Sequence, residues 1–184
     1  MSGCRIHVLK LPNHGGTVPA DLYLSIPGLT DGPGTPQSGT TTIDSVQYLQ
    51  ITSFSFSVAG QPGEPAAATG AGAGKVQFSP FSVVLPVDFA TPRLFQACAT
   101  GKEFATATLL VRVVGAGPQV TTQRYDFKLV VVQSLAVSAS AQSDEQSVSF
   151  GYRALSISFT PVSAQGQAGE TVSGGFDLTQ NKAV

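Results

Sequence analysis

The chain has 184 residues, a formal net charge of -1, and only 11% charged residues against 42% hydrophobic ones. It is long enough for one well-packed core and short for two domains. No excess of basic residues points to nucleic acid or to an anionic membrane as a partner. Because charge is scarce, the polar surface must consist mostly of Ser, Thr, Gln and Gly, which suits an extracellular protein or one covered by neighbouring subunits. Ordinary compositional drift explains the low charge equally well.

No segment is expected to insert into a membrane or to direct export by a cleaved leader. The longest apolar runs, Leu109 to Val114 and Leu129 to Val132, are the size of strands and far below the ~20 residues that span a bilayer. Met1 to Lys10 lacks the apolar stretch and small-residue cleavage site of a signal peptide. Cys4 and Cys98 are too few for a disulfide framework, and we expect Cys98 to be a small buried side chain.

The first third of the chain predicts strands separated by two loops. Residues 1–19 are an N-terminal extension with several Gly and Pro, and residues 20–184 are expected to form a single domain. Ala20 to Ile26 predicts a strand, and Thr30 to Thr42 predicts a loop almost without hydrophobic side chains. Ser45 to Ala59 predicts a further strand, because beyond Gln50 aromatic or β-branched residues alternate with serines.

The stretch from Gly60 to Gly74 interrupts this pattern with glycines, two prolines and a run of alanines. One interpretation is a flexible surface loop. The other is a projecting arm that becomes ordered when it meets a partner. Strand character then resumes from Lys75 to Leu85, with a kink expected at Pro80.

A single helix is predicted from Pro92 to Ala99. Thr91 is a suitable N-cap, Pro92 suits the first turn, and Gly101 is placed to form the C-terminal cap. Leu94 and Ala97 fall at helical spacing and are expected to face the core, together with Cys98.

The second half of the chain predicts one strand after another. Apolar faces are expected at alternate residues, and these are Ala107, Leu109, Val111 and Val113; Tyr125, Phe127, Leu129 and Val131; Val148, Phe150 and Tyr152; Leu155, Ile157 and Phe159; and Phe176 and Leu178. Many strands with one helix predict a mainly β fold, an antiparallel β-barrel or a sandwich of two sheets with one short α-helix.

Residues suited to catalysis or metal binding are scarce. The two histidines, His7 and His14, both lie in the N-terminal extension, and neither cysteine is flanked by a nucleophile motif. The Cys and His residues lack zinc-site spacing, and the adjacent carboxylates Asp144 and Glu145 would point to opposite faces of a strand. Gly70 to Lys75 resembles a phosphate loop only superficially, because Val76 replaces the Ser or Thr that would hold magnesium. We therefore expect a protein that is not an enzyme and that needs no cofactor or metal.

The order of these features resembles the Hcp family, the haemolysin-coregulated proteins. The segments that carry the resemblance are Asp21 to Leu29 (DLYLSIPGL), Ile51 to Phe56 (ITSFSF), Gly74 to Val76 (GKV), Thr91 to Phe104 with its Thr-Pro-x-Leu start, Tyr125 to Leu129 (YDFKL), Glu145 to Phe150, Phe159 to Pro161 (FTP), and Gly174 to Asn181 (GGFDLTQN). Residues 1–19 have no counterpart in the family, and the Thr30 to Thr42 loop is enlarged.

The resemblance implies a structural tube subunit of a type VI secretion system. Family members form hexameric rings that stack into an inner tube inside a contractile sheath. The implied partners are other copies of the chain, sheath and spike proteins, and small effector proteins held in the lumen. The implied location is the cytoplasm before firing and the extracellular space afterwards. The candidate ring-stacking loop comprises Gly60, Gly63, Gly70, Gly72, Gly74 and Lys75.

Three other kinds of protein fit the same residues. A tube protein of a phage tail or of an extracellular contractile injection particle shares the barrel and the ring. A monomeric β-sandwich adhesion or carbohydrate-binding module fits the Ser- and Thr-rich strands. A hydrolase that uses Cys98 or a histidine is the enzymatic alternative.

Overall fold

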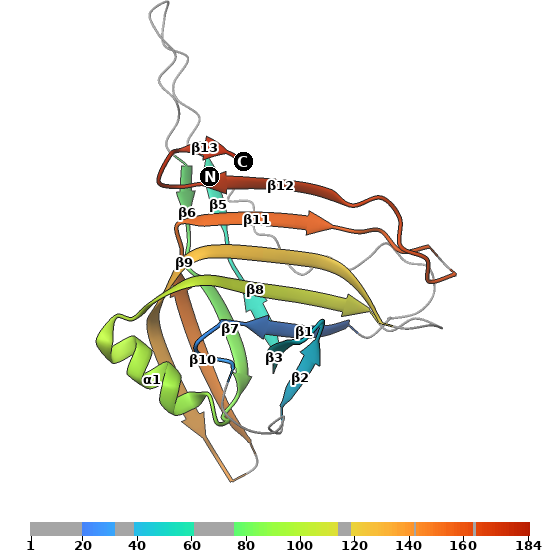
Figure 1. The fold of residues 1–184 in the computed structure, drawn as a ribbon. Coiled ribbons are helices and arrows are strands. Elements are labelled where there is room, and N and C mark those ends of the chain that lie inside the picture. Colours follow the sequence, from blue (N-terminus) through green and yellow to red (C-terminus); the bar gives the residue numbers. More distant parts are fainter. Residues whose placement is uncertain (1–19, 32–38, 61–75, 114–118, 142, 164) are drawn as a thin grey trace, which may run out of the picture.

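A computed structural model describes residues 20–31, 39–60, 76–113, 119–141, 143–163 and 165–184 (Figure 1). The secondary structure is almost entirely β, with one helix among the described residues, as the sequence predicts. The elements are β1 (Ala20–Ser25), β2 (Thr40–Ile43), β3 (Val46–Ile51), β4 (Ser53–Ser55), β5 (Val58–Gly60), β6 (Val76–Phe78), β7 (Phe81–Pro86), α1 (Thr91–Thr100), β8 (Glu103–Val113), β9 (Val120–Ala139), β10 (Asp144–Gly151), β11 (Ala154–Phe159), β12 (Val172–Asp177) and β13 (Lys182–Ala183).

The strands pair around a closed barrel, which favours the barrel over the sandwich. Around its wall, β1 pairs with β8, β8 with β9, β9 with β10, β10 with β7, and β7 with β4, each pair antiparallel. The circle closes because β3, which pairs with β1, continues almost directly into β4. Beyond β9, the sheet extends outward through β11, β12 and β13.

The predicted strand from Ser45 to Ala59 is broken into β3, β4 and β5. The break at Thr52 has a physical cause, because the Thr52 N–H donates to the carbonyl of Val84, 2.7 Å away. At this point the chain leaves its partner β1 and joins β7, so one predicted strand serves two parts of the barrel. The predicted loop from Thr30 to Thr42 is also wrong at its end, since residues from Thr40 onward form β2 and pair with β3.

Strand β9 is 20 residues long and changes the direction of its side chains at Leu129. Leu129 has a φ of 51° and is 38% exposed, whereas Val130 and Val132 are buried. The predicted apolar face at Leu129 and Val131 is therefore wrong. The left-handed conformation at Leu129 interrupts the strict alternation on which the prediction depended.

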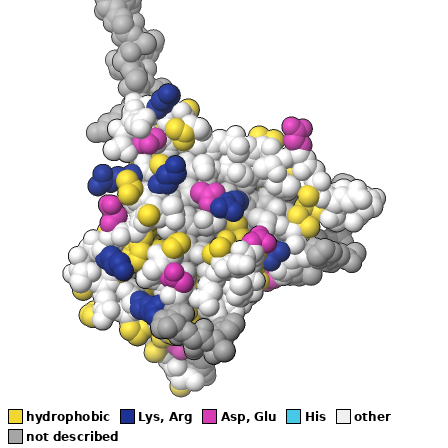
Figure 2. Space-filling model, viewed as in Figure 1, with side chains coloured by type: hydrophobic (Ala, Val, Ile, Leu, Met, Phe, Trp, Pro, Cys, Tyr) yellow, Lys and Arg dark blue, Asp and Glu magenta, His cyan; other side chains and the backbone are white. Residues whose placement is uncertain are grey.

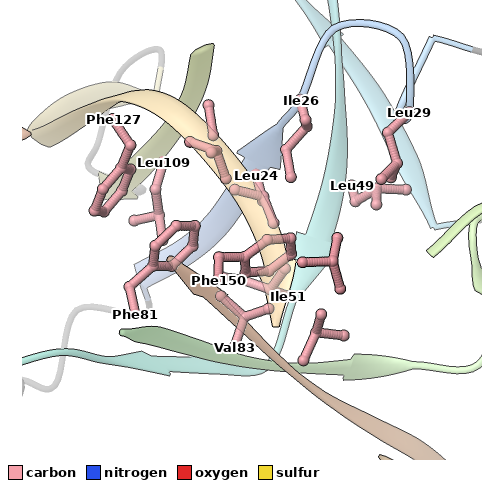
Figure 3. Packing of buried hydrophobic residues seen from close by; sticks show 14 of the residues in the cluster. Leu24, Ile26, Leu29, Leu49, Ile51, Phe81, Val83, Leu109, Phe127 and Phe150 are labelled. Atoms are coloured by element: carbon pink, nitrogen blue, oxygen red, sulfur yellow. The ribbon is translucent and has the colours of Figure 1, made fainter. Parts of the chain in front are cut away.

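The core is centred on three stacked phenylalanines from three different strands (Figure 3). Phe81 lies 4.1 Å from Phe127 and 4.7 Å from Phe150, measured between ring centroids, with interplanar angles of 17° and 14°. The predicted inward residues Ala107 and Leu109 of β8 are fully buried in the same cluster. Phe159, also predicted on an apolar face, is instead 42% exposed.

Helix α1 packs on β9 through Leu94 and Ala97, as predicted. Gly101 has a φ of 63° and forms the C-cap, a left-handed position that glycine adopts most readily. The prediction of Thr91 as N-cap is wrong, because the N-cap is Ala90 and its side chain makes no capping hydrogen bond. A turn before the helix explains the difference. The Thr91 Oγ1 accepts from the N–H of Asp88, and the Asp88 Oδ1 accepts from the N–H of Ala90.

Candidate assembly surfaces

The candidate functional site is a pair of surfaces on the barrel, because the described residues offer no catalytic or metal-binding cluster. Among them, no three His, Cys, Asp or Glu side chains lie close enough to hold a metal ion. Cys98 is a free thiol, partly buried against the core. Cys4, His7, His14 and the segment from Gly70 to Lys75 lie outside the described residues. No helix in the described part of the chain could cross a bilayer.

A row of four serines crosses the wall of the barrel on four neighbouring strands. Ser55 of β4 lies opposite Ser82 of β7, Ser82 lies opposite Ser149 of β10, and Ser149 lies opposite Ser134 of β9. The Ser134 and Ser149 Oγ atoms are 2.5 Å apart, so the row is partly hydrogen-bonded. The row follows from the period-two pattern of each strand once the register brings the strands together.

The next outward row is equally free of charge and consists of Ser53, Val84, Ser147 and Ala136, in the same strand order. Between the two lies an inward row of Phe54, Val83, Val148 and Leu135, which packs in or against the core. We call the two outward rows the serine face. Its side chains are all small and none is ionisable, so the surface carries no charge at any pH.

A second outward surface carries charged side chains on three neighbouring strands. They are Asp21 of β1, Arg112 of β8, and Arg124 and Asp126 of β9, and we call this surface the charged face. Arg124 forms a two-point ion pair with Asp126, with N–O distances of 2.7 and 2.9 Å. The Thr108 hydroxyl also donates to Asp126, and this hydrogen bond anchors the pair on β8. Figure 2 shows basic and acidic side chains next to one another across the side of the molecule on which β8, β9 and β11 lie.

A small cluster of large side chains is buried beneath these charges. Tyr23, Tyr48 and Leu110 form a cluster separate from the main core, with Ile43 packed against it. Burial raises the pKa of Tyr48 above its ordinary value; Asp126 and Asp44 act in the same direction and Arg124 opposes it. The charged face therefore carries a hydrogen-bonded arginine–aspartate pair above a small buried cluster with two tyrosines, and of these residues arginine and tyrosine are types enriched at protein–protein interfaces.

Two sets of predicted site residues differ in how much of them the structure describes. Leu94, Ala97 and Gly101 occupy their predicted places, and Pro92 lies in the first turn of α1. In the candidate stacking loop only Gly60 is described, as the exposed last residue of β5, and the other five residues lie outside the described part of the chain. The sequence alone does not identify the serine face, because its residues come from four separate segments and only the strand register brings them together.

A family model described as "Type VI secretion system effector, Hcp" matches residues 23–159. The chain belongs to the Hcp family. It is therefore a structural tube protein of type VI secretion, a non-enzymatic class, as the resemblance in its sequence implied.

Relatives of known sequence or structure agree with this family. The chain is 29% identical over 110 residues to Protein hcp1 of Pseudomonas aeruginosa, a match that covers 58% of this chain and 68% of the relative. A solved type six secretion system protein has a TM-score of 0.72 at 21% identity and covers 89% of this chain and 99% of its own. Hcp1 from Salmonella typhimurium has a TM-score of 0.67 at 22% identity, with 90% and 99% covered. These two structures share the fold of this Hcp protein.

Proposed function

We propose that this Hcp protein forms six-membered rings that stack into the inner tube of a type VI secretion system. In this proposal residues 20–184 act as one domain, the serine face lines the channel, and the charged face contacts neighbouring subunits or the sheath. The protein stays in the cytoplasm until the system fires and is then exported with the spike. The observation that carries the proposal is the unequal distribution of charge between the two outward surfaces of the barrel.

A channel wall that lets proteins pass must not hold them by fixed charges or by apolar patches. The serine face has neither, because six of the eight residues that define it are serines and none is charged. Hydroxyl groups exchange hydrogen bonds with water at little net cost, so a passing protein stays hydrated. The same hydroxyls can hold a small effector protein in the lumen by many weak contacts.

The edges of the sheet also favour assembly. Strand β2 ends the sheet on one side, and β12 with the short β13 ends it on the other. Exposed strand edges are usually protected by charged side chains, but β2 has the sequence TTTI, and β12 and β13 carry only Asp177 and Lys182. A ring in which each copy contacts the next through different surfaces would cover both edges.

Light scattering and negative-stain electron microscopy of the purified protein test this proposal together. We expect a mass six times the 18.9 kDa of the chain and six-fold rings with an open centre. A monomer mass at micromolar concentration would overturn the ring and favour a monomeric binding module.

We further propose that the segment from Gly60 to Lys75 makes the ring-to-ring contact. Its glycines at 60, 63, 70, 72 and 74 let the backbone adapt to a neighbouring ring. Ordering such a segment costs conformational entropy, so each contact is modest and the contacts act in number. Replacing residues 61–75 with a two-residue turn should leave single rings and remove stacked tubes. Normal tubes from that variant would exclude this role.

A further inference from the structure

The ribbon formed by β5 and β6 stands apart from the barrel. It is a separate two-stranded sheet, in which Val58 lies opposite Phe78 and Gly60 lies opposite Val76. The ribbon continues β4 and β7 of the barrel wall, where the last pair is Ser55 and Ser82. Its direction is therefore not set by hydrogen bonds to the main sheet.

A bulge separates the ribbon from the barrel. Between the pairs Ser55–Ser82 and Val58–Phe78, one strand has two residues and the other has three. Pro80 lies in the longer strand and has no N–H to donate to a ladder. The strands are joined here by one side-chain and one backbone hydrogen bond. The Ser57 N–H donates to the Ser79 Oγ at 2.7 Å, and the Ser79 N–H donates to the Ser57 carbonyl at 2.9 Å. Bulges bend and twist paired strands, so this point is a natural hinge.

An aromatic contact with the C-terminal strands holds the ribbon on the far side of this hinge. The ring of Phe78 stacks on Phe176 of β12, with a centroid distance of 5.4 Å and an interplanar angle of 29°. It also meets Tyr152 edge-on at 6.3 Å. Phe176 is itself fixed between Leu155 of β11 and Ala183 of β13. Figure 1 shows β5 and β6 beside the β12–β13 end of the sheet.

We propose that the Phe78–Phe176 contact is a latch that fixes the direction in which the ribbon leaves the barrel, and that Phe176 is a positioning residue for ring stacking. This inference rests on the proposed role of the segment between Gly60 and Lys75, because the ribbon carries both of its ends. A ribbon already held in one direction loses less conformational entropy when the next ring binds, so each contact in the stack is stronger. A ribbon that moves freely at the hinge loses that entropy at each contact.

Four variants test the latch. Phe176→Ala and Phe78→Ala remove the contact from opposite sides, so a defect that both share does not come from damage to β12 alone. Phe176→Tyr keeps an aromatic ring and should restore stacking. Phe159→Ala is the matched control, because Phe159 is on the neighbouring strand, is 42% exposed, and takes no part in the aromatic contacts among the described residues.

Three measurements apply to each variant. Light scattering should report unchanged ring mass for all four. Amide hydrogen exchange at residues 58–60 and 76–78 should be about threefold to tenfold faster in the two latch variants, since an aromatic pair contributes free energy of that order. Electron microscopy at a fixed protein concentration should show stacked rings reduced by about tenfold in the same two variants and unchanged in the tyrosine variant and the control.

Two results would overturn the latch alone. One is unchanged exchange of the ribbon amides in Phe176→Ala and Phe78→Ala. The other is normal stacking in those variants while the variant with residues 61–75 replaced has lost it, which would keep the stacking segment and remove the latch. Normal tubes from the variant lacking residues 61–75 would overturn the stacking segment itself, and the latch with it.

Discussion

Ser134 and Ser149 face each other across β9 and β10 with their Oγ atoms 2.5 Å apart, and Ser149 also lies opposite Ser82. Ser149 is therefore one of the two inner residues of a four-serine row that spans the serine face. A side chain placed at this position projects from the middle of the surface that we assign to the channel. In a ring of six copies, a single substitution would repeat six times around the opening.

Substitution of Ser149 by Lys should therefore leave the ring intact and weaken the binding of an effector protein in the channel. Ser149 points away from the core, so we expect the free energy of unfolding to change by about 1 kcal/mol or less. Six lysines around the channel should reduce co-elution of a small effector protein with the ring by roughly tenfold, through repulsion or desolvation of the cargo surface. Size-exclusion chromatography of ring and effector measures this.

The matched control is Gln96→Lys, which introduces the same charge at an exposed position of α1, outside the serine face, the charged face and the sheet edges. It should bind the effector as the unsubstituted ring does. Equal loss of binding in both variants would show that the serine face is not the channel wall.

In β9 the alternation of inward and outward side chains shifts by one residue at Leu129, and this shift gives a second prediction. Val130 is fully buried and Leu129 is 38% exposed. Val130→Asp should prevent folding, because an unpaired carboxylate in the core costs several kcal/mol. Leu129→Asp should lower the free energy of unfolding by only about 1 kcal/mol. Circular dichroism shows whether Val130→Asp folds, and urea denaturation measures the cost of Leu129→Asp. A folded Val130→Asp together with an unfolded Leu129→Asp would restore the alternation that the sequence suggests.

The apolar alternation of the sequence was sufficient to predict the inward faces where strands are regular. Ala107, Leu109 and Val111 in β8 confirm this, because each strand residue alternates between two faces. The same pattern fails at Leu129, where a left-handed backbone shifts the phase, and no glycine or asparagine in the sequence marks the position. The break of the Ser45–Ala59 strand at Thr52 was equally hidden, since its cause is a hydrogen bond to Val84 in another strand.

The helix and the serine face also show that the sequence predicts local features but not long-range pairing. Pro92 and Gly101 act locally, and both were predictable from the sequence. The N-cap was not, because the turn closed by Asp88 moved the start of the helix. Serines alternate visibly in β4, but nothing in the sequence states that Ser55 lies opposite Ser82. Long-range register is a property of the packed barrel.

The C-cap of α1 gives a third prediction. Gly101 has a φ of 63° and open space where a Cβ would lie, so Gly101→Ala tests backbone conformation alone. We expect a loss of about 1 kcal/mol in the free energy of unfolding. Gly174→Ala is the control, because Gly174 also has open space but no positive φ, and it should be neutral or slightly stabilising. Equal denaturation midpoints for the two variants would contradict the cap.

The last prediction concerns alkaline stability and Tyr152. Burial raises the pKa of Tyr152 to about 12, and its hydroxyl has no hydrogen-bond partner among the described residues. In the unfolded chain the tyrosine pKa is about 10. The folded state therefore holds the proton more tightly, and the resulting stabilisation is complete below pH ~10 and is lost as the pH rises toward 12.

Tyr152→Phe removes this ionisation while keeping the ring that contacts Phe78 and Phe127. At neutral pH the variant should be as stable as the original or more stable by about 1 kcal/mol, because it no longer buries an unpaired hydroxyl. Between pH ~10 and ~12 it should lose less stability than the original. Some loss will remain, since burial also raises the pKa values of Tyr48 and Tyr125. Urea denaturation over this pH range measures both curves, and parallel curves would show that the Tyr152 hydroxyl is open to water in the folded protein.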